Sequence, residues 1–381
     1  MEESIGRLKE LLGERTEEVE REYIRHDFNL HRWLNAYQGD VEETAKVLSR
    51  HLHIRRIMGL SQLAEDESSS CPIIDKHAPI SILGRNKEED NLVTLWELTG
   101  LLDIHGLVQN IRISRFMKSR FRWMERVHRQ VVDEERRSGR QGGALYIMDL
   151  QHISFSPSLL SIIAGPYRIM WGTLFEQYPQ MIQRIVIINA PTFINLLFST
   201  CKPFIPDDFL SRITIVSTNS PCDSLLKYID KRILPSRYIK EESPFVHPEI
   251  EEPQRPFPQA EKLSIQLTTI RIPAGSQTFI KLYLEEEEEL TVYTHHDSEV
   301  TCFWFYSQEN TTDQTKWEEA IAGCERPALP TLDILHWTVP RTGYYTVRYG
   351  NEKAWFLSVS LGYSYHTKTR GILTPIQVYT K

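Results

Sequence analysis

The chain has 381 residues, of which 41% are hydrophobic and 25% charged, and its formal net charge is -7. This composition is ordinary for a folded globular protein of two or three domains, and it excludes a disordered or fibrous chain. The negative net charge argues against a dedicated nucleic-acid binder, whose affinity depends on a basic surface that neutralises phosphates.

Cysteine usage and the N-terminal residues bear on the compartment. The five cysteines form no C-x-x-C pair, so we expect neither a disulfide framework nor a zinc site. The first residues, MEESIGRLKELLGER, are acidic and amphipathic, unlike a secretory leader. No run reaches the ~18 apolar residues of a membrane-spanning helix. We therefore expect a cytoplasmic protein that contacts membranes from outside.

Residues 1–66 are predicted to form an N-terminal helical region. Ile5, Leu8 and Leu12 recur at helical spacing, and a second amphipathic segment starts near Asp27 and breaks at Gly39. The polar stretch EDESSSCP that follows is typical of a surface loop.

Residues 67–243 are predicted to mix strands and helices. Three short, branched, apolar runs are predicted strands: ALYIMDL (144–150), RIVIINA (184–190) and RITIVST (212–218). Between the first two, Ser156 is placed to cap a helix and Pro157 occupies its first position. This alternation indicates an α/β layer with a buried, largely parallel sheet.

The C-terminal third has a different pattern. Residues 244–259 are proline-rich and are predicted to link two domains. Residues 260–366 alternate apolar and polar side chains between turn signals, as is typical of an antiparallel β-sandwich, and residues 367–381 are predicted to form a tail. The expected fold class is therefore multidomain: N-terminal helices, an α/β domain and an all-β sandwich.

The helix predicted around Phe193–Phe198 is apolar on nearly every side, so both of its faces need cover. Either another helix covers the second face, or the helix forms the outer wall of a ligand-filled cavity. Moving an 18-carbon chain from a bilayer into water costs on the order of 14 kcal/mol, at roughly 0.8 kcal/mol per methylene. A lipid carrier therefore needs a dry pocket, and an apolar helix suits its lid.

Four segments in this order and spacing resemble the CRAL-TRIO lipid-binding family, which includes yeast-type phosphatidylinositol transfer proteins: YIMDLQHISFS, FEQYPQMIQRIVIINAP, KPFIPDDFLSRITIV and LLKYIDKRILPSRY. Upstream, LHRWLNAYQGDVEETAKVLSRHLHIRR resembles the N-terminal helical region of that family. After the linker, IRIPAGSQTFIKLYL and TGYYTVRYGNEKAWFLSVSLGYSY resemble a GOLD domain, a β-sandwich of Golgi and secretory-pathway proteins.

The resemblance implies a gating helix at Phe193–Ser199 over a pocket. The strands at Tyr146–Leu150 and Ile185–Asn189 would form the pocket floor. The implied lipid-binding residues are apolar or aromatic side chains of these elements and of the intervening helix: Tyr146, Met148, Phe155, Tyr167, Met170, Trp171, Leu174, Ile188, Phe193, Leu196, Leu197 and Phe198.

Three polar residues are candidate headgroup contacts: Asp149, Lys202 and Arg212. Asp149 closes a strand at the carboxyl edge, where ligands often bind in α/β sheets, but a carboxylate there equally suits the cap of a turn. Lys202 precedes Pro203, so a solvated lysine at a helix end explains it as well as an anion site does.

In the phosphatidylinositol-transfer branch, four positions hold the headgroup. This chain has Tyr37, Gln180, Phe209 and Arg212 at those positions. Only Arg212 keeps the charge of the family residue, so the resemblance does not carry inositol recognition over to this chain.

Two charged segments have alternative explanations. The segment RISRFMKSRFRWMERVHRQ predicts a helix whose basic face includes Arg122 and Arg126. This face either meets an anionic membrane, at about 1 kcal/mol per placed charge, or is a solvated surface interrupted by Glu125. The run Glu285–Glu289 is predicted to form a hairpin tip or an edge-protecting run or, alternatively, a docking site for a basic partner.

Enzyme signatures are poor. The sequence has no G-x-S-x-G elbow and no P-loop, and GRQGG (139–143) precedes its strand, whereas a dinucleotide loop follows one. We expect a non-enzyme without cofactor or metal that binds one lipid or lipophilic molecule in a gated pocket, for lipid transfer or presentation.

The alternative is a membrane-associated signalling or trafficking adaptor, in which the GOLD-type sandwich recruits proteins and lipid is regulatory. The expected partners are a hydrophobic lipid, a membrane contacted peripherally at the Golgi or other intracellular membranes, and a protein at the sandwich. No nucleic acid is expected.

Overall fold

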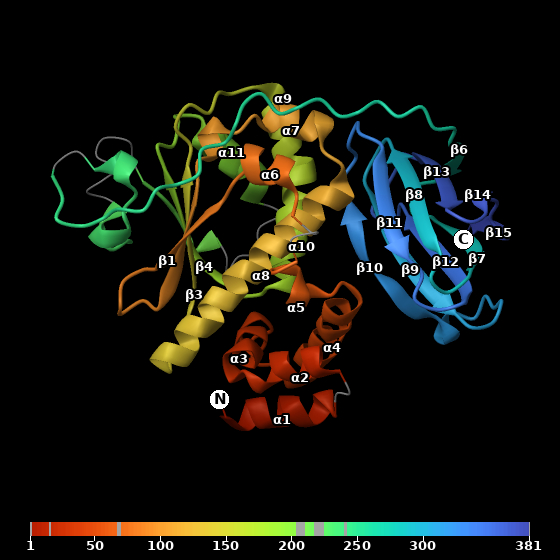
Figure 1. Cartoon of the computed structure of the whole chain (residues 1–381), viewed down its shortest axis with the longest axis horizontal. Helices are drawn as coiled ribbons and strands as arrows, with labels where there is room; N and C mark the ends of the chain where they lie inside the picture. The colour runs from red at the N-terminus through yellow and green to blue at the C-terminus, as the bar shows by residue number, and fades with distance from the viewer. Residues whose placement is uncertain are drawn as a thin grey trace. The chain divides into compact units, whose positions relative to one another are not determined.

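The structure is a computed structural model that describes residues 2–14, 17–66, 70–202, 210–216, 225–239 and 242–380. The chain divides into two compact units (Figure 1). The first comprises Met1–Ile104, Ser119–Ala164 and Leu174–Phe257. The second comprises His105–Lys118, Gly165–Thr173 and Pro258–Lys381.

The N-terminal part of the first unit is helical, as predicted. Its helices are α1 (Glu2–Leu12), α2 (Glu18–Arg25), α3 (Asp27–Ala36), α4 (Val41–Ile57), α5 (Leu60–Leu63) and α6 (Pro72–His77). Ile5, Leu8 and Leu12 are buried in the core that α1 to α4 share. The predicted break at Gly39 is confirmed, because Gly39 has a φ of 83° and the carboxylate of Asp40 then caps α4 by accepting from the amide of Glu43.

The α/β part of the first unit contains one mixed sheet. Within the described residues its strands lie in chain order, and β1 is antiparallel to β2 while the others are parallel: β1 (Ser81–Arg85), β2 (Leu92–Glu97), β3 (Gly143–Asp149), β4 (Ile182–Ile188) and β5 (Ile213–Ile215). The three predicted strands correspond to β3, β4 and β5, and the expectation of a largely parallel sheet is confirmed. The strands β1 and β2 were not among the sequence predictions.

Helices connect the parallel strands: α7 (Ile104–Asn110), α8 (Ile113–Ser138), α9 (Pro157–Ile162), α10 (Arg168–Gln177) and α11 (Ile194–Cys201). As predicted, Pro157 opens α9 and the hydroxyl of Ser156 caps it, accepting from the amide of Leu159 at 3.2 Å. A wider helical turn over residues 163–167 contains Pro166, so the predicted single helix is divided into α9 and α10.

The two faces of the sheet are covered by different parts of the chain. Parallel crossovers are right-handed in almost all proteins, and here each successive strand is added in the same direction, so the crossover residues that belong to the first unit lie on one face. The Trp123 ring of α8 contacts the Tyr146 ring of β3 on that face, with 6.2 Å between centroids. The opposite face is covered by Leu225, Ile229 and Leu234, which join the buried side chains of the strands in one core.

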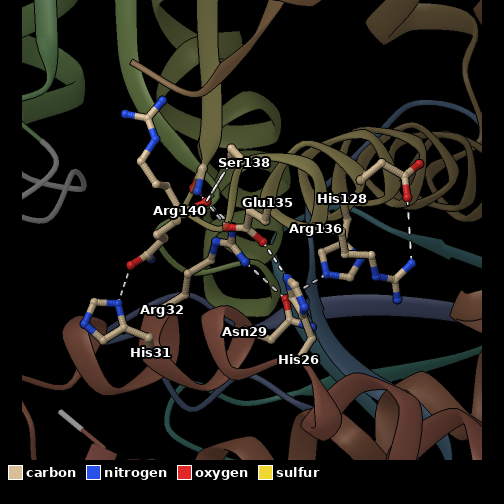
Figure 2. A network of polar contacts seen from close by, with 12 residues as sticks. His26, Asn29, His31, Arg32, His128, Glu135, Arg136, Ser138 and Arg140 are labelled. Atoms are coloured by element: carbon tan, nitrogen blue, oxygen red, sulfur yellow. Dashed lines mark hydrogen bonds and ion pairs between the residues drawn. The ribbon is translucent and has the colours of Figure 1, made fainter. Parts of the chain in front are cut away.

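A buried ion pair connects α3 to α8 in the first unit. Figure 2 shows Arg32 and His26 pointing toward the carboxylate of Glu135. The same carboxylate accepts from the amide of Gly142 at 2.7 Å, and Arg32 also donates to the carbonyl of Gly142. The start of β3 is therefore held by the helix that precedes it and by the N-terminal region.

A second buried ion pair connects α4 to α8. The guanidinium of Arg55 donates to both carboxylate oxygens of Glu125, at 2.7 and 3.0 Å. The hydroxyl of Tyr178 donates to Glu125 at 2.6 Å, and the ring of Tyr23 lies 4.6 Å from the guanidinium carbon. Glu125 therefore belongs to the interior. The prediction that it interrupts the basic face of α8 is wrong.

The buried histidine His51 predicts acid sensitivity. Its Nδ1 lies 2.9 Å from Oε1 of Gln177, and burial, assisted by the charge of Arg55, lowers the pKa of His51 to about 3. The unfolded chain binds this proton near pH 6.5, so the free energy of unfolding falls as the pH falls from about 6.5 toward 3, by up to ~1.4 kcal/mol per pH unit. We expect His51→Gln to reduce this pH dependence in urea unfolding.

The control is the free energy of unfolding of His51→Gln at neutral pH. It measures the effect of the substitution itself, apart from the pH dependence. The burial of His128 also lowers its pKa well below the ordinary value, so part of the acid sensitivity should persist in the variant. A pH dependence equal to that of the unsubstituted protein would contradict the assignment.

The second unit contains antiparallel strands in two sheets. The first sheet has the order β10-β9-β12-β7-β15, and the second β11-β8-β13-β14, with β6 also paired to β13. The strands are β6 (Thr268–Ile272), β7 (Gln277–Leu284), β8 (Glu289–His296), β9 (Val300–Ser307), β10 (Glu318–Arg326), β11 (Asp333–Thr338), β12 (Gly343–Gly350), β13 (Val359–Thr367), β14 (Gly371–Leu373) and β15 (Gln377–Thr380).

Both sheets contribute to one core, with Trp304 from one and Leu361 from the other. The predicted antiparallel sandwich is therefore present. Residues 367–381, predicted as a tail, include β14 and β15, which extend the two sheets. The predicted linker has no helix or strand, but its amides at Gln254 and Phe257 are hydrogen-bonded within the first unit.

The acidic run connects β7 to β8, which lie in different sheets, so it is a connection between the two sheets and the predicted hairpin tip is wrong. Glu285, Glu286 and Glu287 are exposed, whereas Glu288 is buried and pairs with Arg370. Across the part of the chain that the structure describes, no helix has the length and apolar character needed to cross a bilayer. In the same residues, no group of three or more His, Cys, Asp or Glu side chains is arranged to hold a metal ion.

Candidate functional site

The helix-covered face of the sheet is apolar along its central and edge strands. Tyr146 and Met148 alternate onto this face of β3. The strand register aligns them with Ile185 and Ile187 of β4. These in turn align with Ile213 and Ile215 of β5. We call these six residues the apolar face.

The apolar face is sealed at its centre and open at its edge. Tyr146 is fully buried beneath Trp123, and its hydroxyl donates to Glu97 at 2.7 Å. Met148 is half-buried, and Ile215 on the edge strand is exposed. The open part of the apolar face therefore lies toward β5, next to the crossover that contains α11.

The predicted gating helix corresponds to α11, which begins at Ile194 with Phe193 as its cap. Among its described side chains, Ile194 and Phe198 are half-buried and Leu196 is exposed. The ring of Phe193 contacts that of Phe155, which is also exposed, with centroids 5.4 Å apart. In this structure the apolar helix therefore retains water-exposed apolar surface. The side chain of Leu197, a predicted lipid contact, lies outside the described part of the structure.

One predicted floor residue lies on the other face. Ile188 is one position out of phase with Ile187, so it points away from Tyr146 and Met148 and is fully buried in the opposite core. The residues that line the apolar face but were missed are Ile185, Ile187, Ile213 and Ile215. Their signal is strand alternation, which requires a register that the sequence alone does not supply.

The other predicted lipid contacts divide between the two units. Leu174 is fully buried in the first unit. Tyr167, Met170 and Trp171 group with the second unit, where the rings of Tyr167 and Trp171 lie 6.0 Å apart. The structure therefore brings the rings of Phe155 and Phe193 into contact and aligns Met148 with Ile187 across the strand pair, and it leaves the predicted role of the three residues of the second unit untested.

Asp149 is buried and its carboxylate is engaged by protein donors. One oxygen accepts from the amide of Gln151 and from the side chain of Asn189, both at 2.8 Å. The other accepts from the hydroxyl of Tyr238, whose pKa is raised by burial and by this carboxylate. These bonds match the turn-capping alternative for Asp149.

The three candidate headgroup residues do not form one group. Asp149 ends β3 at the carboxyl edge, whereas Arg212 precedes β5 at the amino edge, where it donates to the side chain of Gln180. A seven-residue strand separates these edges by roughly 20 Å. Lys202 is exposed at the end of α11. The family position at Phe209 lies outside the described residues.

The family comparison agrees with this arrangement of sheet and crossover helices. The CRAL/TRIO domain family matches residues 76–238, which include the whole α/β sheet. These residues are a CRAL/TRIO domain. A second family, described as F28H7_8_C-like, C-terminal domain, matches residues 253–372. Its description does not name the GOLD fold, so GOLD identity stays a prediction.

Relatives share the CRAL/TRIO domain and most of the remaining chain. The chain is 29% identical over 346 residues to the CRAL-TRIO domain-containing protein F28H7.8 of Caenorhabditis elegans, covering 87% of this chain and 82% of that protein. It is 20% identical to the protein ctg-1 of the same organism, covering 87% and 89%. A crystal structure of Sfh5 aligns with a TM-score of 0.47 at 17% identity, covering 68% of this chain and 88% of that one.

A polar pocket lies at the surface of the first unit. Its volume is about 490 Å³, and its lining includes Ser70 and Asp75 together with Lys76, Arg122 and Arg126. Part of the predicted basic face of α8 therefore lines this hollow. Charged walls do not suit an acyl chain, so this pocket is a poor candidate for a hydrophobic ligand.

Proposed function

We propose that the chain binds a single hydrophobic lipid or lipophilic molecule against the apolar face, beneath α11. The observation that supports this proposal is the water-exposed apolar surface of Phe155, Leu196 and Ile215 in one unit. A bound acyl or isoprenoid chain would remove this surface from water, which is favourable at roughly 25 cal/mol per Å². The CRAL/TRIO match supports a hydrophobic ligand for the domain.

We propose that α11 is the movable lid of this site. Its described apolar side chains are only partly buried, so displacing the helix would break few contacts with the rest of the unit. The contact between Phe155 and Phe193 would close the site at the carboxyl edge of the sheet. A lid of Leu, Ile and Phe also tolerates a lipid environment when it opens.

A polar headgroup, where the ligand has one, would lie toward Lys202 and Arg212. Asp149 already accepts three hydrogen bonds from the protein, so it has little capacity left for a ligand. This orientation directs the hydrophobic part of the molecule along the apolar face toward Phe155.

The proposed activity is binding for transfer or presentation, without a catalytic step or a resident cofactor. We propose that the protein works in the cytoplasm, in peripheral contact with the Golgi or other intracellular membranes. The two antiparallel sheets of the second unit support the proposal that this unit is of the GOLD type and recruits a protein partner.

Mass spectrometry of small molecules extracted from protein purified from eukaryotic cells would test lipid binding. We expect one lipid class to be recovered in stoichiometric amount. Uptake of labelled lipid from vesicles provides an independent measurement. Recovery of no lipid in repeated preparations, together with no uptake, would refute the proposal.

A further inference from the structure

The loop between β12 and β13 carries three consecutive large apolar side chains in water. Trp355 is 86% exposed, Phe356 90% and Leu357 74%. None of them belongs to the core of the second unit, whereas every position of the flanking strands β12 and β13 is buried or half-buried. Such a run is unfavourable for a soluble surface unless it has a function. We call residues 355–357 the apolar tip.

The apolar tip is held in place by its base. Asn351 is buried, and its side-chain amide donates to the carbonyl of Leu357 at 2.8 Å and to that of Ile272 at 3.2 Å. The amide of Asn351 donates to the carbonyl of Ser276, and the amide of Ala354 to the carbonyl of Asn351. One asparagine therefore joins both ends of the loop to the neighbouring β6–β7 turn, and the apolar tip projects from a fixed base.

The charged residues next to the apolar tip already have hydrogen-bonding or ionic partners. The ammonium of Lys353 pairs with Glu325 at 2.6 Å, and the carboxylate of Glu352 accepts from the hydroxyl of Thr301 at 2.9 Å. The tip therefore does not present an unpaired basic cluster of the kind that selects anionic lipids. Its contact surface is apolar.

We propose that Trp355, Phe356 and Leu357 insert into the interfacial region of a zwitterionic bilayer and anchor the second unit there. Aromatic side chains, Trp in particular, favour the boundary between headgroups and acyl chains. Aromatic side chains bury about 150–250 Å² each, so these three residues supply less than the ~800 Å² that each partner needs in a stable protein interface. The anchor goes beyond the proposed lipid site, because it acts whether or not the pocket holds a ligand.

Sedimentation with phosphatidylcholine vesicles tests the anchor. The full chain should sediment with the vesicles, and the triple variant Trp355→Ser/Phe356→Ser/Leu357→Ser should bind at least tenfold more weakly. Because these side chains are exposed, the variant should keep the circular dichroism spectrum and the unfolding midpoint of the unsubstituted protein. Raising NaCl from about 0.1 to about 0.5 M should leave binding of the unsubstituted protein unchanged, since the contact is apolar.

A matched control is available in the same unit. Ile372 and Ile376 are exposed apolar residues outside the apolar tip, and Ile372→Ser/Ile376→Ser should sediment with vesicles like the unsubstituted protein. The variant Leu196→Asp, which alters the proposed lipid site, should also sediment normally. This result separates failure of the anchor from failure of the proposed function.

Three results would overturn the anchor. The first is absence of the unsubstituted protein from the vesicle pellet, and the second is equal sedimentation of the triple variant. The third is a dimer in sedimentation velocity that becomes a monomer in the triple variant, because the apolar tip would then contact a second copy of the chain.

Discussion

Replacing Leu196 by aspartate is expected to lower lipid uptake from vesicles at least tenfold while leaving the fold intact. Leu196 lies on α11 and is 48% exposed, so a carboxylate at this position remains hydrated in the ligand-free protein. Closing the helix over a lipid would take that carboxylate out of water, which is strongly unfavourable without a partner. Transfer of a fluorescent lipid from donor vesicles measures the effect.

The same substitution at Leu11 is the matched control. Leu11 lies on α1 in the same unit and is 49% exposed, so Leu11→Asp introduces the same charge on a helix surface of equal exposure. A second matched pair is Ile215→Asp, at 36% exposure, and Ile73→Asp, at 38%. If Leu196→Asp took up as much lipid as Leu11→Asp, and Ile215→Asp as much as Ile73→Asp, the apolar face would not be the lipid site.

Replacing Arg55 by methionine is expected to destabilise the protein by about 3–5 kcal/mol, because it leaves a buried carboxylate without its cation. Glu125 is buried and loses two hydrogen bonds from the guanidinium, keeping only the one from Tyr178. The stacking contact between Arg55 and Tyr23 is also lost. Urea unfolding followed by circular dichroism gives the change in the free energy of unfolding.

The double variant Arg55→Met/Glu125→Leu should recover part of this loss, since it removes the uncompensated charge. Recovery will be incomplete, because the buried hydroxyl of Tyr178 then lacks its acceptor. A loss below about 1 kcal/mol for Arg55→Met would mean that the pair is solvated in the native protein.

The segments of the CRAL/TRIO domain could be predicted from sequence. The sequence could not show which side chains of β4 point to which face of the sheet. The run RIVIINA is apolar at almost every position, as expected for a strand buried on both faces. Uniform burial removes the alternation that would distinguish Ile187 from Ile188. Only pairing with β3 decides that Ile187 lies beside Met148 while Ile188 lies beside Asp149.

The predicted headgroup set shows a second limit. Asp149 is predicted from its place at the end of a strand and Arg212 from its match to a charged position of the family, so the two predictions rest on separate arguments that do not fix the distance between the residues. The strand direction places them at opposite edges. The hydrogen bonds that engage Asp149 come from Gln151, Asn189 and Tyr238, and two of these donors are distant in sequence.

Strands β1 and β2 were missed for a related reason. The six residues of β2, Leu92–Glu97, are all buried, and such a short run has no periodicity that separates a strand from a helix turn. Glu97 at its end is polar but buried, and its carboxylate accepts from the hydroxyls of Thr99 and Tyr146. The buried carboxylate of Glu97 holds the ring of Tyr146, which closes the centre of the apolar face.

The unequal cover of the two sides of the sheet bears on how relatives of this protein diverge. Leu225, Ile229 and Leu234 lock one side of the strands together without taking part in the proposed ligand contacts. Substitutions at Ile213 or Ile215 can therefore reshape the ligand side while strand pairing is preserved from behind. Such an arrangement lets a new cargo preference evolve at little risk to folding.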